Sequence, residues 1–209
     1  MAISLILLAP LVKNSSERIT KQMEYEKVQL LTQDADRGLE LIGRSIRMAG
    51  YRRTETFLHP SGNKFNKSQT SKPLVRAGEF IRIQKNVGYR NSDSLLVWHE
   101  ISQGIDFDCI GNVLSSERTK NHLAHQGFLV ERQATAPKGA RVNGGSLICQ
   151  SLDRQGRLQN TTLMNGVNQL LIETQVDSLD RVFKVTLEMT DGVSIHRKFE
   201  RHFFARNLR

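Results

Sequence analysis

The fold is decided by a stretch near the N-terminus, VQLLTQDADRGLELIGRSIRMAGY, which spans residues 28–51. Its apolar residues recur at steps of three and four, the spacing that places side chains on one face of an α-helix. Gly50 supplies a C-terminal stop, and Arg44 and Arg47 before it complement the helix dipole. We expect this face to pack on the remainder of the chain; it consists of Val28, Leu31, Ala35, Leu39, Ile42, Ile46 and Ala49.

The helical pattern continues upstream of this stretch. Residues 14–37 contain neither proline nor glycine, so the pattern predicts one helix of about 45 residues. Residues 2–12 form an uncharged apolar run, about half of the roughly 20 residues that a helix needs to cross a bilayer. A secretory signal peptide is the rival interpretation, but no basic region precedes the run and no cleavage site follows it. We predict a partial transmembrane segment formed by Ile3, Leu5, Ile6, Leu7, Leu8, Leu11 and Val12.

Beyond residue 50 the hydrophobic period changes from helical to strand-like. Residues 51–73 are polar and carry a turn signal at 60–63, so we expect a long surface connection there. Short apolar or alternating runs predict strands at 80–84, 94–99, 127–131, 145–151, 170–175, 182–190 and 193–204. Asp191-Gly192 suits the positive backbone angles of a tight turn and predicts a hairpin between the last two runs.

These elements predict an α+β fold in which a long N-terminal α-helix packs on an antiparallel β-sheet. At 209 residues the chain is too short for two domains with separate large cores. We therefore divide it into the helix, residues 1–50, and one β-rich globular domain, residues 51–209.

The chain is basic, with 30 Lys and Arg against 21 Asp and Glu and a net charge of +9. A nucleic-acid or anionic-membrane partner is one explanation of such an excess. The basic residues are scattered between Lys13 and Arg209 and form no run of five or more, which is typical of a solvated surface. We therefore expect a merely basic surface, with a weak DNA contact as the open alternative.

The two cysteines, Cys109 and Cys149, lie in separate β-rich segments, each beside residues of buried character. A disulfide between them is the preferred interpretation. Closing a loop of about forty residues would stabilise the domain by roughly 4 kcal/mol. Two buried free thiols are the alternative.

Two pairs of side chains have the spacing of a metal or catalytic site. His122 and His125 are spaced as two metal ligands on one helical face, but no third ligand accompanies them. Asp106 and Asp108 would share one face of a strand as paired carboxylates. Turn chemistry explains the two aspartates better, because no nucleophile or base motif stands near them.

A glycine pattern has the spacing of a phosphate-binding loop. Gly139 and Gly144 match the two glycines of that motif, but Gly145 stands where the motif requires lysine. Without this cation a turn between strands is the better explanation. We therefore predict no catalytic, cofactor or metal site, and a chain that is not an enzyme.

The run from Asp34 to Tyr51 closes with Ile46-Arg47-Met48-Ala49-Gly50-Tyr51. This ending resembles the N-terminal helix of PilW-like minor pilins of type IV pili. Further similarities follow in the family's order: Ser92-Asp93-Ser94-Leu95, Asp108-Cys109-Ile110-Gly111, Leu147-Ile148-Cys149, Asn165-Gly166-Val167 and Arg206-Asn207. Together these landmarks extend over almost the whole chain.

The resemblance implies a pilin-like fold and a non-catalytic subunit that acts in type IV pilus assembly or initiation. Such a subunit is made as a prepilin with a single-pass anchor in the inner membrane and a periplasmic domain, and a prepilin peptidase processes it. Its later partners would be other minor and major pilins, in the cell-surface pilus or its tip. No cofactor is implied.

The chain departs from that family at its start, where the Gly-Phe-x-x-x-Glu processing site is absent. Residues 2–12 resemble the second half of the family's anchor, and we expect roughly a dozen or more residues to be missing before them. A type II secretion pseudopilin is the nearest rival, because it shares the plan of helix and sheet. A basic DNA-binding module, such as a DNA-uptake pilin, is the alternative from another class.

Overall fold

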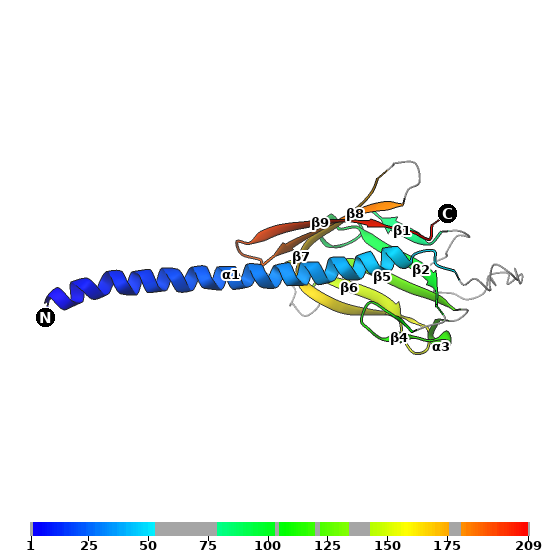
Figure 1. Cartoon of the computed structure of the whole chain (residues 1–209), viewed down its shortest axis with the longest axis horizontal. Helices are drawn as coiled ribbons and strands as arrows, with labels where there is room; N and C mark the ends of the chain where they lie inside the picture. Colours follow the sequence, from blue (N-terminus) through cyan, green and yellow to red (C-terminus); the bar gives the residue numbers. More distant parts are fainter. Residues whose placement is uncertain are drawn as a thin grey trace, which may run out of the picture.

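The computed structural model describes residues 2–52, 79–102, 105–119, 122–133, 143–175 and 181–208, with side chains from Lys13 onward. One long helix, α1 (Ala2–Met48), precedes an antiparallel sheet of seven strands. Figure 1 shows the C-terminal half of α1 lying along the sheet and its N-terminal half extending well beyond it. The predicted α+β class is confirmed, with one long N-terminal helix and a main antiparallel sheet.

The strands of the main sheet are hydrogen-bonded in the order β1-β2-β5-β6-β7-β8-β9. Their bounds are Ile81–Gln84 (β1), Ser94–Glu100 (β2), Leu123–Arg132 (β5), Gly145–Leu152 (β6), Leu158–Gln175 (β7), Val182–Thr190 (β8) and His196–Phe204 (β9). A separate small sheet pairs β3 (Asp106–Phe107) with β4 (Val113–Leu114). Two short helices, η1 (Tyr89–Asn91) and α3 (Ser116–Thr119), complete the described elements.

The core lies between α1 and one face of the main sheet. Five side chains on the helix or directly after it are at most 1% exposed: Ala35, Leu39, Ile42, Ile46 and Ala49. They join alternate residues of the strands in one cluster, which includes Leu95, Phe128, Leu147, Leu170 and Leu187. Every second residue of a strand points to the same face of a sheet, so these positions form one apolar layer. Full burial of each large aliphatic side chain stabilises the fold by about 1.5–3 kcal/mol.

The face of α1 that packs on the sheet becomes less buried toward the N-terminal end of the helix. Leu31 packs against the core only in part, and Val28 is half-buried outside the core cluster. Residues 13–27 are exposed throughout, because the helix has passed the end of the sheet at this level (Figure 1). The sheet therefore covers the later part of the predicted face.

The apolar run at 2–12 belongs to α1. No helix in the described parts of the chain carries an apolar stretch long enough to cross a membrane. The side chains of the predicted membrane segment lie outside those described: Ile3, Leu5, Ile6, Leu7, Leu8, Leu11 and Val12.

The strand predictions were least accurate for β7, which begins at Leu158 rather than near Leu170. Its first half is polar and partly exposed, so it lacks the apolar alternation that indicates a strand. Gly166 has a positive φ of 79°, and the pairing with β8 shifts register between Val167 and Gln169. Such a bulge lets the long strand β7 bend while it remains hydrogen-bonded to both β6 and β8. The predicted connection at 51–73 lies outside the described residues beyond Arg52.

The hairpin predicted around Asp191-Gly192 is confirmed, because β8 pairs with β9. Its loop is wider than the predicted tight turn, since β9 begins at His196 rather than at Val193. The Asp191 carboxylate accounts for the wider loop. Its Oδ1 accepts hydrogen bonds of 2.9, 3.0 and 2.9 Å from the backbone amides of Val193, Ser194 and Ile195. Donation by the Ile195 and Val193 amides lowers the pKa of Asp191, so the carboxylate stays charged and orders the loop around itself.

Candidate functional site

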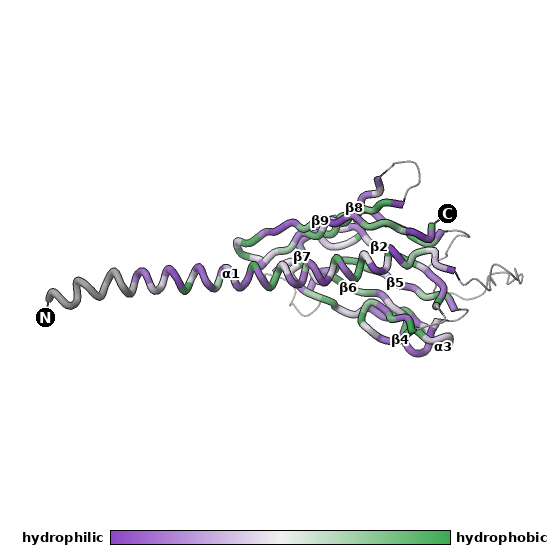
Figure 2. Tube along the Cα trace, viewed as in Figure 1, coloured by the Kyte–Doolittle hydropathy of each residue, from purple (hydrophilic) through white to green (hydrophobic). Residues whose placement is uncertain are grey.

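The part of α1 that extends past the sheet carries exposed apolar side chains. Ile19, Met23 and Leu30 are 56%, 55% and 62% exposed. Their steps of four and seven residues place them within about 40° of each other around the helix axis. The residues that pack on the sheet lie on another face, turned by about 135°. Ile19, Met23 and Leu30 are named the helix stripe below; Figure 2 shows this part of α1 as mainly hydrophilic with isolated hydrophobic positions.

The docked half of α1 is fixed by close contacts with the C-terminal strand. A Cβ on Gly43 would lie 2.1 Å from the Phe203 ring, so only glycine allows β9 to approach this closely. Asp36 on α1 forms an ion pair of 2.7 Å with Arg201. Asn207 Nδ2 donates a 3.0 Å hydrogen bond to the carbonyl oxygen of Arg47. These contacts set the direction in which α1 leaves the sheet.

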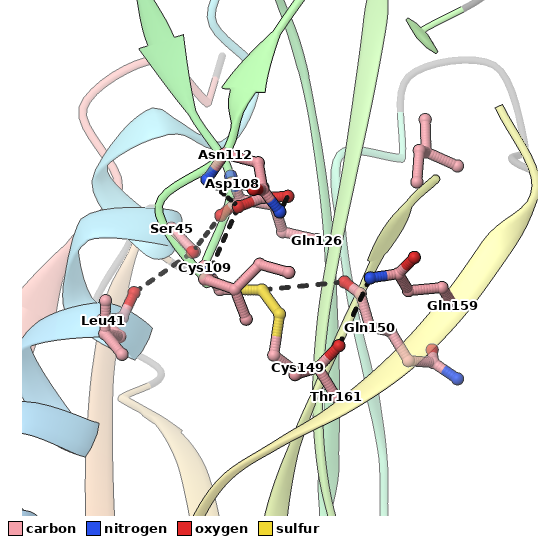
Figure 3. The surroundings of a disulfide bond; sticks show 12 residues. Leu41, Ser45, Asp108, Cys109, Asn112, Gln126, Cys149, Gln150, Gln159 and Thr161 are labelled. Atoms are coloured by element: carbon pink, nitrogen blue, oxygen red, sulfur yellow. Dashed lines mark hydrogen bonds between the residues drawn. A yellow bond between two sulfur atoms is a disulfide. The ribbon is translucent and has the colours of Figure 1, made fainter. Parts of the chain in front are cut away.

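A disulfide joins Cys109 to Cys149 (Figure 3). Of the two interpretations of the cysteines, the structure thus has the disulfide. Cys149 lies in β6, whereas Cys109 follows β3, so the bond tethers the β3–β4 hairpin to the main sheet. Both residues are buried, at 4% exposure or less.

Two side chains connect this hairpin to α1. Ser45 Oγ donates a hydrogen bond to Gln126 Oε1, and Gln126 Nε2 donates to the carbonyl oxygen of Phe107 at 3.1 Å. The chain of bonds crosses from α1 through β5 to β3, and Figure 3 shows Ser45 and Gln126 beside the disulfide. Because Ser45 and Gln126 are buried, losing either partner would leave an unsatisfied polar group.

A buried ion pair holds the base of the hairpin. Asp108 Oδ2 accepts a 3.0 Å hydrogen bond from Arg118 Nη2, and both residues are buried. Asp108 Oδ1 also accepts the amide of Asn112 at 2.8 Å. Arg118 donates in addition to the carbonyl oxygens of Val113 and Leu152. Removing one partner of such a pair leaves an uncompensated buried charge, which costs several kcal/mol.

The outer face of the tethered hairpin is apolar and exposed. Ile105, Phe107 and Val113 are 70%, 37% and 51% exposed. Phe107 is paired with Val113 across the two strands, and Ile105 precedes Phe107 by two residues, so the three side chains share a face. Arg44 of α1 lies over the Phe107 ring, 5.9 Å from its centroid. Ile105, Phe107 and Val113 are named the hairpin patch below.

Two buried histidines, His99 and His125, lie in the neighbouring strands β2 and β5. Burial lowers the pKa of His99 to about 4; the nearby Asp106 opposes this shift and Arg44 adds to it. Burial also lowers the pKa of His125 to about 4, against a hydrogen bond with Gln150. The ring of His125 meets Trp98 edge-on, with centroids 5.5 Å apart. Both imidazoles are therefore neutral at pH 7.

His122 and His125, whose spacing suits two ligands on one helical face but for which we predict no metal site, do not lie on a helix. His122 precedes β5 with a positive φ of 59° and is exposed, whereas His125 is buried within that strand. The two rings therefore do not share a helical face. Within the described ranges, no group of three or more His, Cys, Asp or Glu side chains could hold a metal ion.

The other two patterns have local structural explanations. Asp106 accepts hydrogen bonds from the amide and the hydroxyl of Ser102, at 2.6 and 2.9 Å, and Asp108 binds Arg118 instead. The two carboxylates thus serve separate partners. Gly144 turns the chain with φ at 75° and Gly145 begins β6, while Gly139 lies outside the described residues.

Comparison with known proteins identifies no relative of this chain. No family model matches the chain, and neither does any curated protein or solved structure. The resemblance to PilW-like minor pilins therefore stays a prediction from the sequence.

Proposed function

We propose that this chain is a PilW-like minor pilin, a non-catalytic subunit that acts in the assembly or initiation of a type IV pilus. The observation that carries the proposal is the division of α1 into a docked half and a projecting half. Ile42 and Ile46 are 0% exposed in the first, whereas the helix stripe is exposed in the second. A pilin-like arrangement of helix and sheet accounts for both.

A helix that extends free of its domain needs a partner for stability. Most helical stability in proteins comes from tertiary packing of an amphipathic face, and exposed apolar side chains gain free energy when they leave water. Contact with neighbouring helices, or with a membrane before assembly, would cover the helix stripe. This supports a subunit whose helix is completed by association with other minor and major pilins.

The disulfide supports the proposed location. Disulfides persist in oxidising compartments and are rare in the cytosol, which suits a periplasmic domain. We infer an inner-membrane anchor at the apolar start of α1, processing by a prepilin peptidase, and later residence in a cell-surface pilus. A type II secretion pseudopilin would use the same helix and sheet in another apparatus.

The arrangement of charge favours assembly over nucleic-acid binding. On the sheet, Lys184 and Lys198 both approach the carboxylate of Glu200, at 3.4 and 2.8 Å. On the helix, Arg47 lies 2.5 Å from Glu40. A nucleic-acid site needs positive charge clustered on one face, and cations paired with carboxylates supply less of it.

Deletion and complementation of the native gene test the proposal. We expect deletion to remove surface pili, counted by electron microscopy, and the native gene to restore them without changing type II secretion. Loss of secretion with intact pili would support the pseudopilin instead. Unchanged piliation and unchanged secretion would contradict both, and DNA uptake measured in the same strains tests the third alternative.

A further inference from the structure

We propose that a cavity between the β3–β4 hairpin and the turn joining β6 to β7 binds an acidic sugar, a monosaccharide with one carboxylate. Carbohydrate binding goes beyond the proposed assembly function and does not depend on it. The cavity has a volume of about 330 Å³, within the range of small-molecule sites. It is lined by Asn112, Val113, Arg118, Asp153, Arg154 and Gln159.

The cavity lies away from the projecting half of α1. One wall comes from β4 and α3, and the other comes from the β6–β7 turn and the start of β7. Figure 1 shows β4 and α3 at the end of the domain farther from the N-terminus of α1. Contacts made through the projecting helix therefore leave the cavity open.

Both walls are fixed without a ligand. Arg118 ties the hairpin wall to Asp108 and to the carbonyl oxygen of Leu152 at the end of β6. Asp153 orders the turn, because its Oδ1 accepts the amides of Gln155 and Arg157 at 2.9 and 2.8 Å. A site that is fixed before binding loses little conformational entropy when a ligand enters.

The charge in the cavity selects an anion. Arg118 is paired with Asp108 at 3.0 Å, and Arg157 is paired with Asp153 at 2.8 Å. Arg154 is exposed and has no ion pair or hydrogen bond within the described residues. It leaves one uncompensated positive charge, and a planar guanidinium binds a carboxylate through two parallel hydrogen bonds.

A buried donor in the cavity wall lacks a partner. Arg118 is 9% exposed, and its two terminal nitrogens donate to Asp108 and to the carbonyl oxygens of Val113 and Leu152. Its Nε is buried and donates to no other atom in the part of the chain that the structure describes. A buried donor without an acceptor costs free energy, so this wall favours an oxygen-rich ligand over an apolar one.

The remaining lining groups suit the hydroxyls and the ring of a sugar. Asn112 Nδ2 donates to Asp108 at 3.3 Å, and Gln159 Nε2 donates to Thr161 at 3.4 Å, so both amide oxygens remain as acceptors for hydroxyl groups. Val113 of the hairpin patch is 51% exposed and offers apolar surface to the C–H groups of a sugar ring. A carboxylate, several hydroxyls and an apolar ring face occur together in an acidic sugar.

Two-dimensional ¹H–¹⁵N NMR of the full chain in detergent micelles tests the site, with D-glucuronate as the probe. Titration should shift the amide resonances of Asn112, Val113 and Arg154 with one dissociation constant on the order of 1 mM, as expected for a single sugar. D-Glucose lacks the carboxylate and acetate lacks the hydroxyls, so each should bind about tenfold more weakly. Equal binding of acetate would contradict a sugar site, and equal binding of glucose would contradict the role of the charge.

Two arginine variants locate the binding. Arg154→Gln should weaken the binding of D-glucuronate about tenfold, because it removes the unpaired charge. Arg197→Gln is the matched control, since Arg197 is exposed on the edge strand β9, and it should leave the affinity unchanged. Equal losses in the two variants, or resonance shifts confined to residues outside the cavity, would overturn the proposal.

Methyl β-D-glucuronide distinguishes two sources of the sugar. Binding equal to that of the free acid assigns the ligand to the end of a glycan, whereas binding of the free acid alone assigns it to a small soluble compound. No binding of either refutes the sugar site and leaves the assembly proposal intact. The assembly proposal fails separately, if deleting the gene leaves pili unchanged.

Discussion

The two halves of α1 share one helical period but have opposite surroundings. Ile42 in the docked half is 0% exposed, whereas Ile19 in the projecting half is 56% exposed. Both are isoleucines on a continuous helix, so their intrinsic preferences are the same. The difference shows that periodicity identifies which residues share a face, and that the extent of the sheet decides whether the face is covered.

The largest expected effect comes from charging the two isoleucines separately. Ile42→Asp should lower the free energy of unfolding by about 5 kcal/mol, because it buries a carboxylate without a partner. Ile19→Asp should change it by less than about 0.5 kcal/mol, since that side chain is in water. Urea unfolding of both variants measures the contrast, and equal effects would contradict the assigned docking of α1.

Removing the disulfide should weaken the domain without involving the projecting helix. Replacing Cys109 and Cys149 together by serine should lower the free energy of unfolding by about 4 kcal/mol, the loop-closure estimate for a separation of 40 residues. The same urea experiment on the double variant measures the loss. Intact mass with and without reduction verifies the bond in the wild-type chain, and two free thiols there would contradict the structure.

Acid should destabilise the β-rich domain, because two of its histidines, His99 and His125, are buried. Each has a folded pKa of about 4, against about 6.5 in an unfolded chain. The unfolded state therefore binds protons first as the pH falls, so stability is complete above about pH 6.5 and is lost down to about pH 4. At pH 5 the loss should be about 2 kcal/mol for each histidine.

Urea unfolding between pH 7 and pH 5 measures this slope. The variants His99→Gln and His125→Gln should each remove about half of it, whatever their stability at pH 7. A slope that persists in the double variant of His99 and His125 would contradict the assignment.

The smallest expected effect on stability comes from replacing either of two glycines in the docked half of α1, Gly43 and Gly38, by alanine. Gly43→Ala should destabilise by about 1 kcal/mol, since the clash of its Cβ with the Phe203 ring outweighs the better helix propensity of alanine. At Gly38 the nearest atom to an added Cβ is the Met164 methyl group at 3.1 Å, and a flexible methionine end can move. Gly38→Ala should therefore be neutral or stabilising, and thermal melting ranks the two.

Sequence patterns predicted elements well where local periodicity and burial agree. The strand predicted at 182–190 coincides with β8, and the packed face from Ala35 to Ala49 is buried. They failed where polar side chains decide the structure, as at Asp191, whose carboxylate binds three amides and delays β9. They also missed β3 and β4, because two-residue strands carry no detectable period.

The residues that hold the hairpin could not be singled out from the sequence. Gln126 and Arg118 are buried polar side chains, and their partners lie far along the chain, at Ser45 and Leu152. A polar residue inside an apolar run is the available signal for such a role. That signal does not name the partner, since hydrogen bonding between distant segments depends on the fold.

The sequence by itself determined the helix, the common face of its apolar residues, most strands, and a pair of cysteines suited to one bond. Side chains on one face recur every 3.6 residues in a helix and every 2 residues in a strand. The spacing of apolar residues along the chain therefore indicates these properties. Only the tertiary structure decided where the sheet stops covering α1, and that Arg44 stacks on Phe107 beside an exposed patch. Those outcomes depend on contacts between distant segments, whose geometry no local pattern encodes.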